Sequence, residues 1–453
     1  MTTSPSDDFI TGQGAGWRAG YLAGVMAERR RAEGGGGGPN PGSPLLGTMM
    51  EECGRLFETE VLPRMDPTSR AMLAQVNRAG RDAVRLFPAE LACAGRTVGV
   101  KLKVMDFAGS VGRLAWAQAN GCLWVARTFV LVAQGGDLET LQWAREHGCP
   151  RHAATCWHAA LGAQVSMVEW LIATGADVNY TRPREGATAV YVASQNGDLD
   201  VVGLLVDAGA DVNLAHNTGV TPLYVAAQHG RLDVVGRLIS AGADVDMAHT
   251  GTGATPLLVA DAYGHVDVVV RLIAAGADAD VALTVTGDTP LFVAAQKGHT
   301  SVVAQLTAAP GVNVNMSRTV DGATPLCLAT RNGHLDVVEW LLAALGMDVN
   351  LATNTGGTPL LVAALYGHVD VMERLLAAPR VNVNQARNTG ATPLYLAVYN
   401  GHIDVVEQLL AAPGVDVNRA RPNGTTPLST ALARGHAEVV RNLRAAGATE
   451  PHA

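Results

Sequence analysis

Six histidines in the second half of the chain each follow a glycine at nearly constant spacing: His265, His299, His334, His368, His402 and His436. Because imidazole nitrogens are common zinc ligands, this repetition first suggests metal chemistry. If each histidine belongs to its own helix pair, however, successive side chains are about 10 Å apart. Zinc holds nitrogen ligands at about 2 Å, so neighbours cannot share an ion. We therefore predict no metal site and expect local hydrogen bonds at the turn between two helices.

No residue pattern typical of an enzyme active site is present in the sequence. The glycine-rich stretch TGQGAG at 11–16 lacks the preceding strand of a nucleotide-binding loop. There is no Walker lysine motif, no nucleophile elbow and no HExxH motif. Acidic pairs such as Asp198 and Asp200 recur where a second helix would begin, and the helix dipole favours a carboxylate there. The sequence therefore predicts no catalysis and no cofactor.

The composition excludes several classes of partner. Apolar residues make up 48% of the chain, and the formal net charge is -8 at pH 7. This charge argues against a general nucleic-acid or membrane binder, because no basic excess is available to neutralise phosphates. The six cysteines lack the pattern of a secreted disulfide scaffold. We expect reduced thiols and a cytoplasmic or nuclear protein that binds neither nucleic acid nor membrane.

The elements that would position these residues repeat along the chain. Equivalent threonines are 33 to 35 residues apart, at Thr188, Thr221, Thr255, Thr289, Thr324, Thr358, Thr392 and Thr426. In one copy, Thr221 and Pro222 suit the N-cap and first position of a helix, and Gly230 suits its end. A second helix should run to Gly242, and the region of Val245 is predicted to be an extended strand leading into the next turn.

The second helix of this copy places Leu232, Val235 and Ile239 on one stripe at helical spacing. A unit of this size cannot bury its apolar face alone. Neighbouring units must therefore stack so that each helix pair is covered on both sides.

The recurring pattern G-x-T-P-L, A-A, G-H, V-V, L-L and G-A-D-V-N resembles the ankyrin repeat. The resemblance covers residues 181–449 as eight repeats. The last is expected to be a C-terminal cap, because Arg444 stands where its predecessor has Leu410. The resemblance implies an all-α repeat solenoid, an ankyrin array of helix-turn-helix units with short β-hairpin fingers.

The array is predicted to extend upstream in altered form. Trp116, Trp143 and Trp170 are each 27 residues apart, which leaves room for two helices but little for a finger. We interpret residues 98–180 as divergent, short ankyrin-like repeats.

One position departs from the ankyrin pattern throughout. The family usually has histidine after Thr-Pro-Leu, and that histidine ties adjacent turns by hydrogen bonds. This chain instead has Tyr224, Leu258, Phe292, Cys327, Leu361, Tyr395 and Ser429. We predict that apolar packing replaces those bonds.

The segment before the repeats allows two interpretations. Residues 1–48 are predicted to be a disordered tail, and residues 49–97 a small helical segment. Within the latter, residues 57–86 are similar to an F-box, with an MDP turn followed by L..VNR..RDAV, although Gly80 stands where that family usually has Trp. The segment is either an F-box, which the resemblance implies would dock on a cullin-type ubiquitin ligase adaptor, or a helical cap over the first repeat.

The residues that vary most between copies lie just before the mid-repeat glycine, whereas core positions hardly change. In the ankyrin family the end of the inner helix and the finger tip line a concave groove. Tyr and Arg are frequent interface anchors, although neutral variation of solvated residues would give the same pattern. The predicted partner-binding residues are Gln228, His229, Tyr263, Gln296, Lys297, Arg331, Asn332, Tyr366, Tyr399, Asn400 and Arg434.

Together these patterns predict a protein-protein interaction scaffold that acts as a monomer. It should bind a protein or peptide partner on the concave face of the solenoid. The alternative is an F-box-like substrate receptor of a cullin-type ubiquitin ligase.

Overall fold

The computed structural model describes residues 111–112, 114–115, 126–134 and 137–450. The chain divides into two compact units, Met1–Gly99 and Val100–Ala453, and all described residues belong to the second. The predicted tail at 1–48 and the segment 49–97, with its F-box-like stretch, therefore lie outside the described residues.

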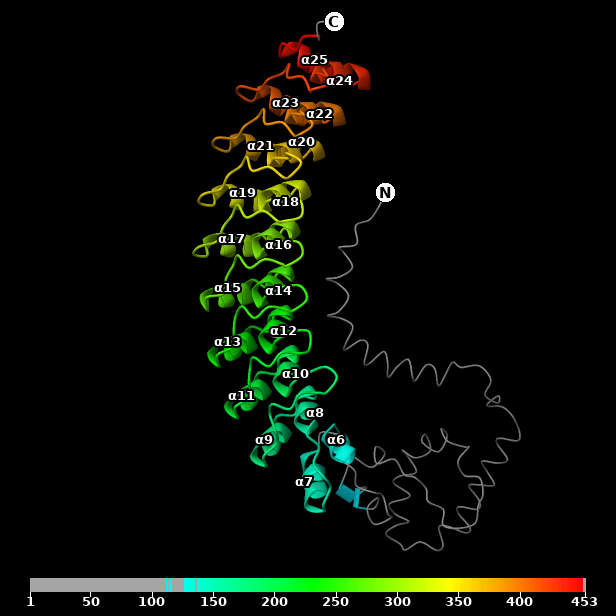
Figure 1. The fold of residues 1–453 in the computed structure, drawn as a ribbon, viewed down its shortest axis with the longest axis vertical. Coiled ribbons are helices and arrows are strands. Elements are labelled where there is room, and N and C mark those ends of the chain that lie inside the picture. The colour runs from blue at the N-terminus through cyan, green and yellow to red at the C-terminus, as the bar shows by residue number, and fades with distance from the viewer. Residues whose placement is uncertain (1–110, 113, 116–125, 135–136, 451–453) are drawn as a thin grey trace, which may run out of the picture. The chain divides into compact units, whose positions relative to one another are not determined.

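Twenty helices of seven to nine residues form ten consecutive pairs in the described part of the second unit (Figure 1). The first helices of the pairs are α6 (Ala126–Gln134), α8 (Thr155–Leu161), α10 (Ala189–Asn196), α12 (Pro222–Gln228), α14 (Pro256–Ala262), α16 (Pro290–Lys297), α18 (Pro325–Asn332), α20 (Pro359–Tyr366), α22 (Pro393–Asn400) and α24 (Pro427–Arg434). The second helices are α7 (Leu138–Glu146), α9 (Val165–Ala173), α11 (Leu199–Asp207), α13 (Leu232–Ser240), α15 (Val266–Ala274), α17 (Thr300–Ala308), α19 (Leu335–Ala343), α21 (Val369–Ala377), α23 (Ile403–Ala411) and α25 (Ala437–Ala445).

The pairs stack in chain order as two layers of helices. Each first helix packs on its own second helix and on the first helices of the neighbouring pairs, and from α9 onward second helices pack on second helices in the same way. The array bends, and the first helices lie along the inner side of the bend (Figure 1). The predicted all-α repeat array is confirmed.

The start of each first helix follows the predicted capping chemistry. In α12, the backbone N–H of Tyr224 donates to Oγ1 of Thr221 over 3.1 Å, and Pro222 occupies the first turn, where its missing N–H leaves no bond unmade. The helix ends at Gln228, two residues before Gly230, whose φ of 66° lies in the left-handed region.

The buried stripe of the second helices differs from the predicted one. In α13 the buried residues are Val234, Val235 and Leu238, whereas Leu232 is 39% exposed and Ile239 is half-buried. At about 100° per residue, Leu232 and Ile239 lie roughly a quarter turn from the centre of that stripe. The predicted stripe was therefore displaced around the helix, and only Val235 belongs to its buried centre.

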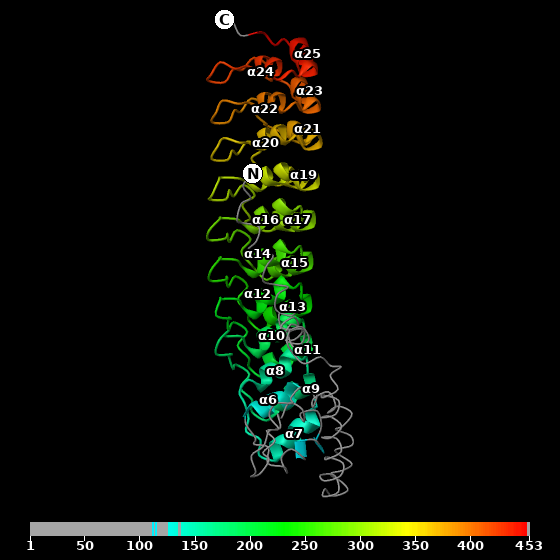
Figure 2. The ribbon, with the colours of Figure 1, turned by 90° about the vertical axis from the view of Figure 1, so that its right-hand side faces the viewer.

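The predicted extended strand at Val245 is wrong. Val245 lies in a turn, and no strand is present among the described residues. Each finger instead closes on itself, as where His249 N–H donates to the Ala254 carbonyl over 2.8 Å. It also bonds to the preceding finger, as where Thr250 N–H donates to the Thr218 carbonyl over 3.1 Å. Neighbouring fingers share at most one such backbone bond, which is too few to form a ladder, so the fingers stack as turns (Figure 2).

Five of the six repeated histidines, His265 to His402, bond through their side chains to the preceding repeat and not within their own turn, which corrects the prediction of local bonding. Nε2 of the sixth, His436, is buried without a hydrogen-bond partner. His265 Nε2 donates over 3.1 Å to the carbonyl of Gln228 in the preceding repeat, and His402 Nε2 donates to Leu365 over 3.2 Å. The imidazole of His265 lies against Gly230, where an added Cβ would be 2.8 Å from Nδ1. The glycine of one repeat thus makes room for the histidine of the next.

A second set of bonds joins the repeats beside the second helices. Asn213 Oδ1 accepts from Asp244 N–H over 2.9 Å, and its Nδ2 donates to the Gly242 carbonyl over 3.2 Å. Where the equivalent residue is Asp246, its Oδ1 accepts from Asp278 N–H over 3.0 Å. A carboxylate has no N–H to donate, so Asp246 cannot make the bond to the neighbouring carbonyl.

The divergent upstream repeats also form helix pairs. The second helices α7 and α9 begin 27 residues apart, at Leu138 and Val165, the interval of the tryptophans. Trp143 and Trp170 are half-buried against the core. Trp340, which occupies the equivalent position in α19, is 49% exposed, so it does not pack as the upstream tryptophans do.

Candidate partner-binding surface

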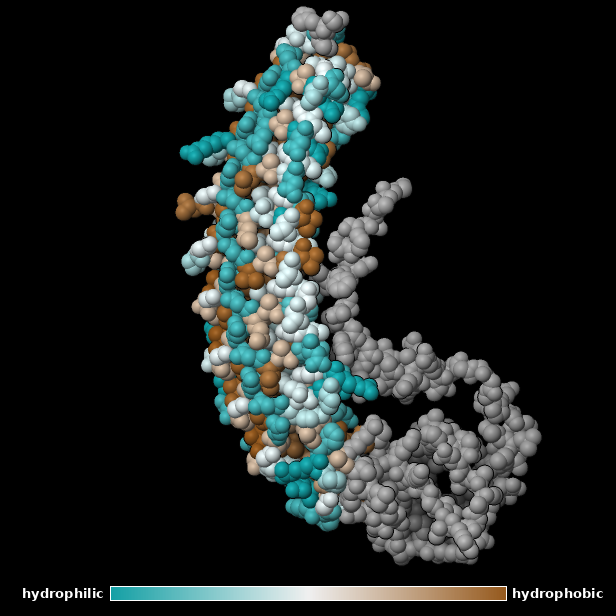
Figure 3. All heavy atoms as spheres, in the orientation of Figure 1, coloured by the Kyte–Doolittle hydropathy of each residue, from teal (hydrophilic) through white to brown (hydrophobic). Residues whose placement is uncertain are grey.

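The predicted partner-binding residues all lie at the C-terminal ends of first helices or on their caps. We call the surface formed by these helix ends and the adjoining fingers the inner face. Gln228 and His229 are half-buried. The other nine are exposed: Tyr263, Gln296, Lys297, Arg331, Asn332, Tyr366, Tyr399, Asn400 and Arg434. Hydrophilic side chains run the length of the array, with hydrophobic ones scattered among them (Figure 3).

The asparagines at these positions tie repeats together. Asn332 Nδ2 donates to the Gln296 carbonyl of the preceding repeat over 2.7 Å, and Asn400 Nδ2 donates to the Leu365 carbonyl over 3.3 Å. This bonding is a structural reason for an asparagine at the helix end, whether or not a partner is bound.

The half-buried residues are likewise held by neighbours. His229 Nδ1 donates to the Val225 carbonyl over 2.9 Å within its own helix turn. Gln228 Nε2 lies 3.5 Å from the hydroxyl of Tyr263 in the next repeat. This contact places a glutamine beside an exposed tyrosine across the repeat boundary.

Two of the three exposed tyrosines, Tyr263 and Tyr366, stack on the histidines of their own repeats. The rings of Tyr366 and His368 are stacked with centroids 6.1 Å apart, and those of Tyr263 and His265 are 6.2 Å apart. Tyr366 is still 46% exposed. One side of each ring is therefore supported while the rest is open to solvent.

The last two repeats bring two tyrosines and two arginines into contact. The guanidinium carbon of Arg434 lies 3.4 Å from the ring centroid of Tyr399, which stacks on Tyr395 at 6.3 Å. Arg421 lies over the Tyr395 ring at 5.0 Å, and its Nη1 donates to the Tyr395 hydroxyl over 3.2 Å. Cation-π contacts thus hold both guanidinium groups on the inner face.

The position that departs from the ankyrin pattern packs against the finger of the next repeat. Tyr191 stacks on His216 with centroids 5.8 Å apart, and the guanidinium carbon of Arg318 lies 5.2 Å from the Phe292 ring centroid. Where an aromatic residue at this position faces a histidine or arginine of the finger, the predicted apolar packing is therefore a ring or cation-π contact. Phe292 and Cys327 do share a small buried cluster, as predicted.

Sequence reasoning missed the finger residues that make these contacts. The available signal was a basic residue recurring near the start of the finger, at Arg182, His216, His249, Arg318, Arg387 and Arg421.

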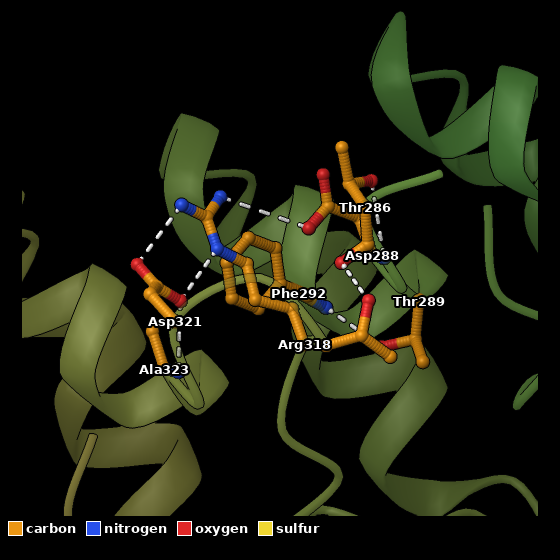
Figure 4. Close-up of polar contacts among 8 residues, drawn as sticks. Thr286, Asp288, Thr289, Phe292, Arg318, Asp321 and Ala323 are labelled. Carbon is orange, nitrogen blue, oxygen red and sulfur yellow. Dashed lines mark hydrogen bonds and ion pairs between the residues drawn. The ribbon is translucent and has the colours of Figure 1, made fainter. Parts of the chain in front are cut away.

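An ion-pair network joins two fingers around Arg318 (Figure 4). Arg318 Nε lies 2.7 Å from Oδ1 of Asp321, and its Nη1 lies 3.8 Å from Oδ1 of Asp288. Burial raises the pKa of the Asp288 carboxyl above its ordinary value. Arg318 thus has its charge balanced by carboxylates of this chain.

Asp261 in α14 is a buried acid that sequence reasoning also missed. Its side chain is 0% exposed, and neither carboxyl oxygen has a hydrogen-bond partner. His299 Nδ1 donates to the Asp261 carbonyl over 2.9 Å but is 3.9 Å from Oδ1, too far for a hydrogen bond. Burial raises the pKa of this carboxyl to about 7. The sequence did contain a signal for this buried acid, because the repeats on either side have alanine at the equivalent positions, Ala227 and Ala295.

Nothing in the described part of the chain assembles a metal or membrane site. No group of three or more metal-ligating side chains comes together there. No helix among those residues has the length and apolar character needed to cross a bilayer. The three described cysteines, Cys149, Cys156 and Cys327, are buried and form no disulfide.

Comparison with known protein families identifies an ankyrin repeat family. A family model for ankyrin repeats (3 copies) matches residues 117–216, 152–249, 236–318, 257–353, 297–386, 345–421 and 380–451. These overlapping ranges run without a gap from 117 to 451. A comparison with curated proteins found no match.

Proposed function

The chain belongs to the ankyrin repeat family, and from this premise we propose that it binds a protein or peptide partner along the inner, concave face of the array. Ankyrin repeats serve in general as protein-protein interaction modules. The observation that supports this particular face is the set of exposed anchors on it, Tyr366, Tyr399 and Arg434. Tyrosine and arginine dominate the binding energy of many interfaces.

The anchors also have the rigidity that favours binding. Tyr366 and Tyr399 lie at the ends of α20 and α22, which first helices contact on both sides, and Arg434 lies at the end of α24, which packs on α22 and α25. The Tyr366 ring stacks on His368, and Arg434 stacks on Tyr399. Side chains held in place before binding lose less conformational entropy when a partner arrives, so more of the contact energy appears as affinity.

Affinity capture with the full chain followed by mass spectrometry tests this proposal. The double variant Tyr366→Ala/Tyr399→Ala should lose the captured partner while its thermal unfolding changes little. Glu373→Ala, an exposed change on the second helix α21, is the matched control and should capture the partner normally. Equal capture by wild type and the double variant would refute binding through these tyrosines.

We also expect a non-catalytic scaffold that acts as a monomer in the cytoplasm or nucleus. Light scattering of the purified chain measures its mass, and a mass of two or more chains contradicts the monomer. Fluorescent tagging in cells locates it, and an exclusively secreted or membrane-bound signal contradicts the compartment.

A second proposal rests on the F-box-like sequence at 57–86. The chain would then present a client held on its repeats to a cullin-type ubiquitin ligase. A pull-down with the ligase adaptor tests this proposal. Capture of the adaptor that is lost when residues 49–90 are deleted would support the proposal, and failure of the full chain to capture the adaptor would refute it.

A further inference from the structure

Charge is distributed unevenly between the two layers of the last four repeats. The first helices α18, α20, α22 and α24 and the fingers 351–357, 385–391 and 419–425 contain no Asp or Glu. The same segments carry five arginines: Arg331, Arg387, Arg419, Arg421 and Arg434. The inner face of these repeats is therefore positive on a chain whose formal net charge is -8.

The second helices of the same repeats have the opposite character. Helices α19, α21, α23 and α25 carry seven carboxylates: Asp336, Glu339, Asp370, Glu373, Asp404, Glu407 and Glu438. Their arginines are paired, as where Arg374 Nε lies 2.6 Å from Glu339 Oε1 and Arg444 Nη2 lies 3.1 Å from Glu450 Oε1. An arginine on this side therefore has its charge compensated within the chain.

The five inner-face arginines lack such compensation. Among the described residues, every ion pair of the last four repeats involves Arg374, Arg441 or Arg444 and none involves the five. The Nε of Arg387 is buried without a hydrogen-bond partner. Arg318, in the finger just before these repeats, differs because it contacts two carboxylates. A finger arginine can therefore have acidic partners in this fold, but the finger arginines of the last repeats have none in the described part of the chain.

Four of the five uncompensated arginines are also held in position. Arg421 and Arg434 rest on tyrosine rings, Arg387 Nη2 donates to Thr355 Oγ1 over 3.4 Å, and Arg419 Nη1 donates to the Asn384 carbonyl over 3.2 Å. A guanidinium held in this way keeps donors available for a carboxylate and loses little freedom on pairing. The tyrosines beside them add exposed aromatic surface.

We propose that this basic inner face, defined by the five arginines with Tyr366 and Tyr399, binds an acidic, extended segment of the partner protein. The inference deepens the proposed function and rests on it. Four repeats span roughly 40 Å at about 10 Å each, which an extended segment of about 12 residues covers at about 3.3 Å per residue. Carboxylates of the segment pair with the arginines, and apolar side chains between them contact the tyrosine rings.

Charge spacing favours a peptide over a nucleic acid. Five arginines over this span place about one positive charge per 8 Å, whereas duplex DNA carries one phosphate charge per about 1.7 Å. The seven carboxylates of the second helices would in addition repel a long polyanion. A segment with acids separated by apolar residues matches the face in both charge and spacing.

A random library of about 12-residue peptides displayed on phage and selected against the full chain tests the proposal. Enriched peptides should carry an excess of Asp and Glu. Binding of an enriched synthetic peptide, measured by fluorescence anisotropy, should weaken at least about tenfold when salt rises from about 50 to 300 mM, because salt screens the charges. Neutral or basic enriched peptides would overturn the proposal.

Charge reversal locates the binding. Arg387→Glu/Arg434→Glu should weaken peptide binding at least about tenfold, whereas the matched reversal on second helices, Arg374→Glu/Arg441→Glu, should not weaken it. Thermal unfolding of both variants shows whether each is folded. Peptide affinity unchanged by the inner-face reversal overturns the proposal, as does a single-stranded oligonucleotide that binds through the same arginines more tightly than the peptide.

The tyrosine and arginine variants distinguish failure of the acidic-segment proposal from failure of the inner face as a binding surface. Suppose that the captured partner is lost on Tyr366→Ala/Tyr399→Ala but retained by Arg387→Glu/Arg434→Glu. The inner face then binds a partner and the acidic segment is wrong. If both variants retain the partner, the inner face itself is not the binding surface.

Discussion

Replacing Asp261 by alanine should stabilise the protein in a strongly pH-dependent way. The carboxyl is completely buried between first helices and has no hydrogen-bond partner. The neighbouring helices α12 and α16 have Ala227 and Ala295 at this position, so the packing accommodates the smaller side chain. Asp261→Ala therefore removes a buried acid from a site that both neighbouring repeats fill with a methyl group.

The magnitude follows from the pKa. Burial raises the pKa of Asp261 from 3.8 to about 7, so between these values the folded chain binds a proton that the unfolded chain has released. Stability therefore falls as pH rises, by about 1.4 kcal/mol per pH unit and by about 4 kcal/mol in total once pH exceeds 7.

His299 acts in the same direction. The nearby Asp261 raises the pKa of His299 above its ordinary 6.5. That contribution to stability is present below pH 6.5 and is lost as pH rises through the raised value. Asp261→Ala removes the source of both effects. From the carboxyl alone, the variant should exceed wild type by about 4 kcal/mol in free energy of unfolding near pH 8 and by about 1 kcal/mol near pH 4.5. Loss of the His299 contribution makes the excess at pH 4.5 smaller still.

Urea denaturation followed by far-ultraviolet circular dichroism across this pH range measures the difference. Ala227→Asp is the matched control, because it places a carboxyl at the same position of α12, one residue before Gln228, whose carbonyl accepts from His265. It should lose stability and acquire a wild-type-like dependence on pH at a second position. An Asp261→Ala variant with the same pH dependence as wild type would show that the buried carboxyl is not the cause.

Four further predictions follow from single residues. Arg380 has a φ of 65°, in the left-handed region, as has the equivalent Gly346 at 79°. Arg380→Gly should therefore stabilise the fold by about 1 kcal/mol in urea denaturation. Gly346→Ala should destabilise it by a similar amount, although the added Cβ would contact no other atom. Asp246→Asn supplies the missing amide donor and should add about 0.5–1.5 kcal/mol; an unchanged urea midpoint would mean that the bond does not form. Leu238→Ala should cost about 2–5 kcal/mol by leaving a cavity, and near-wild-type stability would contradict its burial. Tyr366→Ala alone should reduce partner capture while shifting the melting temperature little; a large shift would make this tyrosine part of the core.

Much of the fold could be predicted because the relevant interactions are local. Thr221 caps a helix that begins one residue later, and Gly230 ends the turn that follows it. Such capping and turn chemistry depends on residues within a few positions of one another, so it can be predicted from the amino-acid sequence alone. The period of the pattern then implies stacking, because no single unit buries its own apolar face.

The candidate site was less predictable because its contacts join different repeats. His265 bonds to Gln228, and Arg421 lies over Tyr395, across more than 25 positions of sequence. Periodicity identified Tyr366 and Tyr399 as variable positions at helix ends. Periodicity did not reveal that the side-chain amides of Asn332 and Asn400 donate to carbonyls of the preceding repeat, because these bonds depend on the distance between neighbouring helices.

The sequence by itself determined the repeating helix pairs, their starts and ends, and the membership of residues 181–449 in a stacked array, because each follows from short-range propensity and a fixed period. Only the tertiary structure decided which side of each second helix is buried, where the histidines bond, and that arginines without acidic partners gather on one face. These features depend on how one repeat is rotated and spaced against the next, and hydrogen bonds and charges act over distances of a few ångströms. A linear pattern does not contain that register.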